Sequence, residues 1–155
     1  MRIALLTETF LPKIDGVVKS VCYLLDHLDK KGHPSLLLAP DGSPKQYAST
    51  PVVQMRACRP FFYPEFRFVS PLQNITPHLE PFKPDLIHVV NPFSLGKLGI
   101  LYAREKHIPL VASYQTDLPG HVGLWGFKIL EKPVENYLYH LHKQADLNLA
   151  PSRAT

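Results

Sequence analysis

Short, continuously apolar runs rich in isoleucine, valine and leucine alternate along this chain with longer stretches in which apolar residues recur every three or four positions. The short runs are typical of strands buried on both faces of a parallel sheet, and the longer stretches of amphipathic helices. The pattern predicts an α/β fold with a mostly parallel sheet of about six strands and helices on both faces. The six expected strands are Arg2–Thr7, Ser35–Ala39, Val52–Met55, Leu86–Val90, Leu110–Tyr114 and Leu147–Ala150.

The first expected helix is the most clearly marked one. Apolar side chains recur at helical spacing from Val18 to Leu28, and a basic last turn then leads to Gly32, a typical helix-terminating residue. Further helices are expected over Leu72–Leu79, Ser94–Lys106 and Lys128–Lys143, the last with a kink near Pro133.

Parallel sheets of this kind bind ligands at the carboxyl ends of their strands. The loops that follow the first, fourth and fifth strands are Glu8–Gly16, Asn91–Ser94 and Gln115–Gly123. All three carry polar side chains that can hydrogen-bond, so we expect the functional site to lie among them.

The first of these loops ends in Gly16, immediately before the first helix. The unpaired N–H groups of a helix N-terminus attract anions, a glycine lets a phosphate approach the backbone, and Lys13 would add positive charge. The same residues fit an ordinary helix start, in which Asp15 accepts from first-turn N–H groups. Both readings stay open, because the chain contains neither G-x-G-x-x-G nor G-x-x-x-x-G-K-[ST].

The loop after the fifth strand gathers amide, hydroxyl, carboxylate and imidazole groups in Gln115, Thr116, Asp117 and His121. Such a group can hydrogen-bond several hydroxyls of a sugar, and Asp117 can accept from one of them. The alternative is a polar turn in which Asp117 caps the backbone. No G-x-S-x-G elbow and no Cys/His pairing of known spacing indicates nucleophilic catalysis.

A third candidate is the segment Arg59–Phe68, where aromatic residues alternate with two arginines. Such a segment can line a site for a sugar or a lipid phosphate, or touch a membrane interface, where aromatic and basic residues both gather. The alternative is a loop folded onto the core, with Glu65 pairing with an arginine.

Composition narrows the function classes. A chain of 155 residues without repeats or linkers indicates one domain over residues 1–155. The net charge of +4 suits anionic ligands or a lipid surface, but the basic residues form no dense block, so no nucleic-acid binding is expected. The N-terminal apolar run is too short for a signal peptide or a membrane span, which favours a cytoplasmic location.

Cysteine and histidine, which often form cross-links or bind metals, are scattered along the chain. Cys22 and Cys58 are expected to be buried free thiols in a reducing compartment. His140 and His142 lie two positions apart on an expected helix and point to different faces, so no metal site is expected.

Eight short motifs follow one another: MRIALLTETFLP (Met1–Pro12), DGVV (Asp15–Val18), Ala39–Pro40 after the Gly32–His33 turn, FYPE (Phe62–Glu65), PDLIH (Pro84–His88), Asn91–Phe93, ASYQTD (Ala112–Asp117) and APSRAT (Ala150–Thr155). Together they resemble the N-terminal half of retaining family 4 glycosyltransferases, which have the GT-B fold. The resemblance covers essentially the whole chain and is closest to mannosyl- and sulfoquinovosyl-transferases that act on lipid acceptors.

This resemblance implies roles for particular residues. It implies that Gly16 and the N–H of Val17 lie beside the diphosphate of a nucleotide-sugar donor. The family usually reads S-Y-H-T where this chain has Gln115, and an amide cannot take up a proton near neutral pH, so Gln115 and Asp117 are expected to act in catalysis by hydrogen bonding. The expected acceptor-binding residues are Lys13, Asp15, Tyr63, Arg67, Asn91, Thr116 and His121.

The resemblance also implies a missing partner. Family members carry a second, nucleotide-binding domain, and Ala150–Arg153 resembles the approach to the hinge before it. We therefore expect a single Rossmann-like domain, one half of a GT-B fold, that needs a C-terminal domain in cis or in trans. The expected ligands are a nucleotide sugar as co-substrate, with no other cofactor, and a lipid or glycan acceptor, with peripheral contact at the inner face of the membrane.

The residues leave a different class of function open. A non-catalytic α/β module can use Gly16 and the helix dipole to hold an anionic ligand, and it would have a complete pocket and a polar surface. An exposed apolar strip beside the carboxyl ends of the strands would favour the half-enzyme, since an absent domain leaves its contact surface bare.

Overall fold

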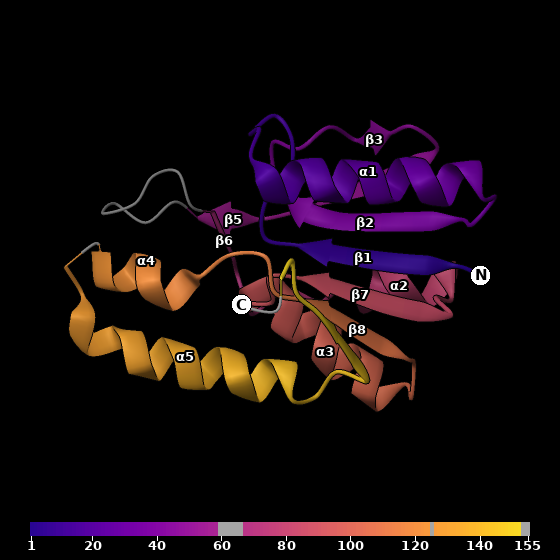
Figure 1. Ribbon diagram of the computed structural model, residues 1–155. Coiled ribbons are helices and arrows are strands. Elements are labelled where there is room, and N and C mark those ends of the chain that lie inside the picture. The colour runs from indigo at the N-terminus through magenta and orange to yellow at the C-terminus, as the bar shows by residue number, and fades with distance from the viewer. Residues whose placement is uncertain (59–66, 125, 153–155) are drawn as a thin grey trace.

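The computed structural model describes residues 1–58, 67–124 and 126–152, and within them a seven-stranded sheet forms the centre of the molecule (Figure 1). Its strand order is β3-β4-β2-β1-β7-β8-β9, and all neighbours are parallel except β3 and β4. The strands are β1 Ile3–Thr7, β2 Ser35–Pro40, β3 Gln46–Tyr47, β4 Thr50–Met55, β7 Leu86–Val90, β8 Leu110–Ser113 and β9 Leu147–Leu149. The α/β class and all six expected strands are confirmed, with ends that differ by one or two residues.

Three very short strands were not expected. The strand β3 forms a hairpin with β4, and β5 (Ala57–Cys58) pairs with β6 (Phe68–Val69) in a separate two-stranded ribbon. Each has only two residues, too few to show an alternating pattern in the sequence.

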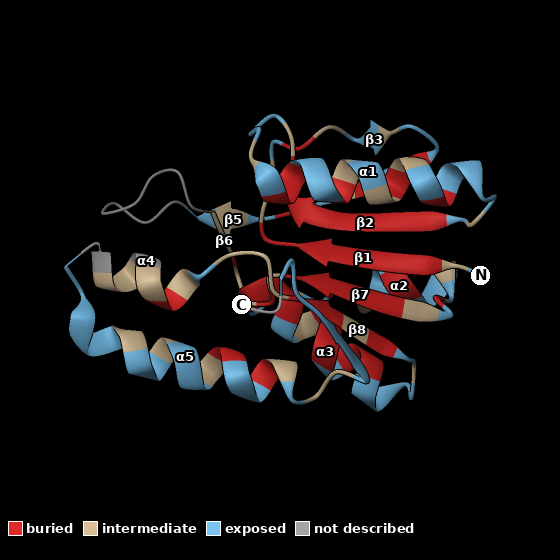
Figure 2. Ribbon diagram, viewed as in Figure 1, coloured by how far each residue is buried: buried red, intermediate tan, exposed pale blue. Residues whose placement is uncertain are grey.

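Helices cover both faces of the sheet, as expected. On one face, residues of α1 such as Val18 and Leu25 pack with Ile3 and Leu5 of β1. On the other, residues of α2, α3 and α5 belong to one hydrophobic cluster with the alternate β1 residues Ala4 and Leu6, so the central strands are buried on both sides (Figure 2). The helices are α1 Gly16–Lys30, α2 Thr76–Phe82, α3 Ser94–Glu105, α4 Leu118–Leu124 and α5 Lys128–His142.

Two helical expectations were wrong in their bounds. The expected helix Leu72–Leu79 begins only at Thr76, because Gln73 N donates to Ser70 O in a turn and leaves Leu72 93% exposed. The sequence predicts a polar loop over Gln115–Gly123, but the chain from Leu118 to Leu124 forms the helix α4. Its proline and two glycines disfavour a helix, and that hid the element in the sequence.

Candidate functional site

A cleft of about 1270 Å³ opens where the strands β1, β7 and β8 end. It is lined by residues of the three loops singled out in the sequence, by Pro40–Ser43 after β2 and by Arg67. The folded chain thus brings together segments more than a hundred residues apart, because the carboxyl ends of parallel strands meet at one edge of the sheet.

The N-terminus of α1 forms one wall of this cleft. Asp15 Oδ1 accepts from Val18 N at 2.9 Å, so Asp15 is the N-cap, and Lys13 Nζ lies 3.2 Å from its other oxygen. Gly16 lines the cleft, and a Cβ placed on it would meet nothing within 4 Å. The N-cap reading of Asp15 is therefore correct. Gly16 is exposed and Val17 is buried, and both residues line the cleft.

Asn91 connects the end of β7 to the loop after β8. Its Oδ1 accepts from Gln115 N at 2.6 Å and from Thr116 N at 3.1 Å, and its Nδ2 donates to Thr116 Oγ1 at 2.9 Å. Asn91 has a φ of 48°, a left-handed conformation that asparagine tolerates better than most residues. In this structure Asn91 and Thr116 bind each other and so fix the backbone that carries Gln115; acceptor binding by either stays a prediction.

Asp117 starts the next helix. Its Oδ1 accepts from Gly120 N at 3.1 Å and from the Tyr114 hydroxyl at 3.3 Å. Asp117 therefore caps the backbone at the start of α4, which is the alternative that the sequence left open for this residue. Asp117 and Gln115 both line the cleft; their catalytic roles stay predictions.

The segment Arg59–Phe68 is described only at its end. Arg67 Nη1 donates to the main-chain oxygen of Asp41 and lies 3.3 Å from its carboxylate, so Arg67 pairs with the loop after β2 at the cleft edge. Tyr63 and Glu65 lie outside the described residues. His121 lies in α4, and its side chain is likewise not described.

Glu8 is a site residue that sequence reasoning missed. It is buried at the start of the cleft loop, where Oε1 accepts from Phe93 N at 3.2 Å and Gly96 N at 3.0 Å, and Oε2 accepts from Ser94 Oγ at 3.0 Å. Burial raises its pKa, while these hydrogen bonds act in the opposite direction. The N-terminus of α3 is thus occupied by the chain's own carboxylate, whereas that of α1 faces the cleft. The only sign of Glu8 in the sequence is that a carboxylate directly follows an expected apolar strand.

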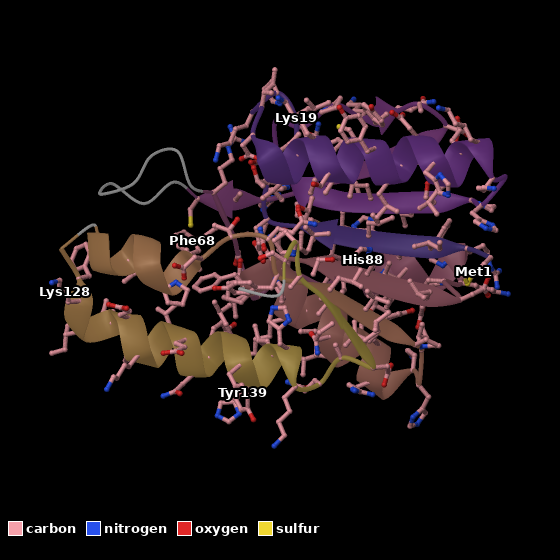
Figure 3. All side chains as sticks on the ribbon, viewed as in Figure 1. Met1, Lys19, Phe68, His88, Lys128 and Tyr139 are labelled. Carbon is pink, nitrogen blue, oxygen red and sulfur yellow. The ribbon has the colours of Figure 1, made fainter. Side chains whose placement is uncertain are left out.

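His88 on β7, labelled in Figure 3, forms a buried polar pair with Ser113 on β8. His88 Nε2 lies 2.6 Å from Ser113 Oγ, and both residues line the cleft. Burial lowers the pKa of His88 to about 4, so the imidazole is neutral at pH 7. It can therefore act as a hydrogen-bonding group in the cleft floor.

Neither histidine nor cysteine gathers into a site in the described ranges. These ranges contain no group of three or more His, Cys, Asp and Glu that could hold a metal ion, and His142 Nδ1 lies 2.8 Å from Asn148 Oδ1. Cys22 is half-buried and Cys58 is exposed, so the expectation of buried thiols was wrong for Cys58, which lies on the two-residue strand β5. No helix within the described residues has the length and apolar character needed to cross a membrane.

Comparison with known families gives a match over residues 14–155 to the model of Glycosyltransferase Family 4. The chain belongs to this family. The resemblance of the eight motifs is thereby confirmed. A GDP-mannose-dependent alpha-mannosyltransferase of Mycobacterium tuberculosis is 34% identical over 100% of this family 4 chain, which spans 43% of that protein.

Two further relatives carry other names. An Alpha-monoglucosyldiacylglycerol synthase of Streptococcus pneumoniae is 32% identical over 79% of the family 4 chain, and the Sulfoquinovosyl transferase SQD2 of Arabidopsis thaliana is 30% identical over 74%. The chain covers 28% and 22% of these proteins. It therefore spans less than half the length of each of these curated relatives.

A solved structure supports the fold. An alpha-glucosyltransferase in complex with UDP and a 13-mer DNA containing a central A:G mismatch matches 99% of the family 4 chain and 37% of its own length, with a TM-score of 0.50 and 14% identity. At this identity the likeness shows the fold alone. It confirms the GT-B type of α/β architecture.

Proposed function

We propose that the chain is the acceptor-side half of a nucleotide-sugar-dependent, retaining glycosyltransferase that transfers a hexosyl group to a lipid or glycan. A second domain, in the same polypeptide or a separate one, supplies most of the nucleotide contacts. The nucleotide sugar is a co-substrate, and no metal or other cofactor takes part. The observation that carries the proposal is the single cleft that joins the α1 N-terminus to the Gln115 loop.

The donor diphosphate binds at Gly16 and Val17. The first N–H groups of α1 lack partners within the helix, and the helix dipole places partial positive charge beside them. Because no Cβ projects from Gly16, a phosphate oxygen can approach the backbone closely. Glu8 already occupies the equivalent end of α3, so a diphosphate is directed to α1 and away from α3.

Gln115 acts by hydrogen bonding. A side-chain amide takes up no proton near neutral pH, so the acceptor hydroxyl must lose its proton elsewhere. In the mechanism that the family resemblance implies, the hydroxyl attacks the anomeric carbon on the face from which the diphosphate departs. A phosphate oxygen receives the proton as the bond between sugar and phosphate breaks. Positioning and electrostatics then supply most of the rate, with Gln115 and Asp117 holding hydroxyls of the substrates.

The acceptor enters from the side of Lys13, Arg67 and the two loops that carry Asn91 and Thr116. The name of the relative Alpha-monoglucosyldiacylglycerol synthase favours a lipid acceptor, and a lipid acceptor places the enzyme at the inner face of the membrane. Large apolar side chains are exposed beside the carboxyl ends of the strands, with Ile14 at 72% and Leu149 at 43%. This exposure supports an interface for a second domain over a self-sufficient binding module.

Reconstitution tests the proposal. The chain is joined to, or mixed with, the C-terminal domain of the related GDP-mannose-dependent mannosyltransferase and incubated with labelled GDP-mannose and membrane lipid. We expect labelled lipid or glycan product. In Gly16→Ala the melting temperature stays close to that of the parent, because the added methyl meets no protein atom, while transfer falls by about tenfold or more.

Two results would contradict the proposal. If Gly16→Ala left the rate of transfer unchanged, the diphosphate would not bind at the N-terminus of α1. Absence of transfer with any family 4 partner domain, together with tight binding of an anionic ligand by the chain alone, would instead support the non-catalytic binding module.

A further inference from the structure

The start of α3 is capped by a side chain from a distant part of the sequence. Phe93, at the N-cap position, has no capping side-chain hydrogen bond of its own, and the first three residues of the helix, Ser94–Gly96, are buried. The N–H groups at a buried helix start need acceptors, because water cannot reach them. The carboxylate of Glu8 provides these acceptors from the end of β1, 85 to 88 positions earlier in the chain.

These hydrogen bonds hold Glu8 away from direct chemistry. Oε1 accepts from the N–H groups of Phe93 and Gly96, and Oε2 accepts from the hydroxyl of Ser94. A general base or a nucleophile needs a lone pair that can reach the substrate. The oxygens of Glu8 are turned to α3, and the residue is only 4% exposed. An effect of Glu8 on a reaction in the cleft must therefore pass through other residues.

Glu8 connects two sides of the cleft. It is the first residue of the loop that leads from β1 to Gly16 at the start of α1. Its partner Phe93 lies two positions after Asn91, whose Oδ1 accepts from Gln115 N at 2.6 Å. A continuous path of backbone and hydrogen bonds thus runs from the first loop, through Glu8 and Phe93, to the Gln115 loop.

The surroundings of this path leave it little freedom. A Cβ on Gly96 would lie 2.6 Å from Pro92 Cβ and 4.0 Å from Glu8 Oε1, so the helix start lies close against the loop before it. The hydroxyl of Tyr137, on α5, donates to Phe93 O at 2.9 Å. Because this region is closely packed, a shift of Glu8 would be passed on to Phe93.

We propose that Glu8 is a positioning residue that sets the distance between the N-terminus of α1 and Gln115. In the proposed function, the diphosphate lies at α1 and the acceptor lies beside Gln115, so this distance determines whether the attacking hydroxyl reaches the anomeric carbon. A misplacement of about 1 Å can lower a rate about 100-fold. The inference rests on the proposed function for the reaction that it affects, whereas the link itself is a property of this chain.

Hydrogen exchange tests the link without any catalysis. Glu8→Gln keeps the size of the side chain, but its NH₂ group cannot accept, so at least one donor of α3 loses its partner. We expect the amide protons of Gln115 and Thr116, which bind Asn91, to exchange about tenfold faster or more than in the parent. The amides of β2 report on global unfolding, and their exchange should accelerate less.

Gly99→Ala is the matched control, because it disturbs the same helix outside the cleft. Its added methyl would meet Leu6 and Val89 in the core. It should therefore leave the exchange of Gln115 unchanged relative to that of β2. Ser94→Ala removes only the donor to Glu8 Oε2 and should give a smaller acceleration at Gln115 than Glu8→Gln does. It provides the same comparison if Glu8→Gln does not fold, which circular dichroism checks.

Kinetics of the enzyme reconstituted with a family 4 C-terminal domain supply a second readout. Glu8→Gln should lower kcat about 10- to 100-fold and change the KM for GDP-mannose less than about threefold, because the alignment is lost while the diphosphate contacts at α1 remain. Gly99→Ala, at a temperature at which the variants are folded, should retain the parent values of both constants.

Each outcome decides for or against the positioning role. An equal fall of kcat in Gly99→Ala and Glu8→Gln would reduce Glu8 to a structural residue and overturn the proposal. So would exchange at Gln115 that follows β2 in both variants. Full transfer by Glu8→Gln contradicts the positioning role alone. Faster exchange at Gln115 without transfer by the parent, with any partner domain, supports the link and contradicts the proposed function alone.

Discussion

At the scale of single residues, Asn91 determines where Gln115 lies. Its one carboxamide accepts from two backbone N–H groups and donates to Thr116, while its own backbone has a φ of 48°. An alanine there would lose the three hydrogen bonds and also disfavour the left-handed conformation. A glycine would lose only the hydrogen bonds.

This difference makes a testable series. We expect Asn91→Ala to lower the free energy of unfolding by about 3 kcal/mol, and Asn91→Gly by about 2 kcal/mol, in urea titrations. Asn136→Ala, at an exposed position of α5, is the control and should change it by less than about 0.5 kcal/mol. If Asn91→Gly were as stable as the parent, the hydrogen bonds to the Gln115 loop would contribute nothing.

The buried imidazole of His88 gives the fold a pH dependence. Its pKa is lowered by burial from 6.5 to about 4. Between pH 6.5 and 4, the unfolded chain therefore binds a proton at this imidazole that the folded chain does not bind. The neutral His88 therefore contributes to the free energy of unfolding. This contribution is fully present above pH 6.5 and is lost as the pH falls toward 4, by about 3 kcal/mol in all.

His88→Gln removes the titrating ring and keeps an amide nitrogen near Ser113. We expect the difference in unfolding free energy between parent and variant to change between pH 6.5 and 4 and to stay constant above this range. Glu8, whose raised pKa acts with the opposite sign, titrates in both proteins and cancels in the difference. If the unfolding free energies of parent and variant instead changed in parallel from pH 6.5 to 4, the imidazole of His88 would take up its proton as readily in the folded state as in the unfolded state.

The sequence could identify some of these residues and not others. The N-cap reading of Asp15 could be made from the sequence because its partner Val18 lies only three positions away, where helix-capping rules apply. Glu8 was missed, and the contacts of Asn91 with the Gln115 loop were not expected, because Glu8 binds residues 85 to 88 positions away and Asn91 binds residues 24 and 25 positions away. Only the register of the parallel strands brings these groups together.

At the scale of elements, the close approach of α3 to the sheet depends on Gly99. A Cβ at this position would lie 2.9 Å and 3.2 Å from the two Cδ atoms of Leu6 and 3.1 Å from Val89 Cγ1. These contacts are with the fully buried core, which cannot easily give way.

We therefore expect Gly99→Ala to destabilise the chain by about 1 to 3 kcal/mol in urea unfolding, despite the better helix propensity of alanine. Gly16→Ala is the matched control. It makes the same change at the first position of α1, where nothing lies within 4 Å, and should be neutral or slightly stabilising. Equal effects of the two substitutions would contradict the packing argument.

Elements were predictable where they are long and strongly patterned. The strands β1, β2 and β7 are mostly apolar, because both of their faces are buried, and α1 and α5 each bury one stripe. The helix α4 escaped because its glycines and proline are turn-forming residues, and its start depends on Asp117 accepting from Gly120 N. Tertiary packing overrides local propensity in such short elements.

At the scale of the whole molecule, one edge of the sheet collects the main candidates for chemistry among the described residues. The α1 N-terminus, Asn91 with Gln115, and the buried Glu8 all lie there because the strands β1, β7 and β8 run in parallel. The fold thus gathers the groups that could orient substrates around one cleft.

The last prediction concerns the chain without a second domain. Helix N-terminal N–H groups contribute about 2 kcal/mol at most to holding an anion, whereas association costs about 4 kcal/mol or more in lost freedom. Lys13, the cation nearest Gly16 in the first loop, is already paired with Asp15.

Titration calorimetry with GDP-mannose should therefore show a Kd weaker than about 1 mM for the chain alone. In the presence of a family 4 C-terminal domain, binding should tighten at least about 100-fold, because contacts from two sides then hold one ligand. Gly16→Ala should reduce that gain. Saturable micromolar binding of GDP-mannose by the chain alone would contradict this prediction, because the chain would then contain a complete nucleotide site of its own.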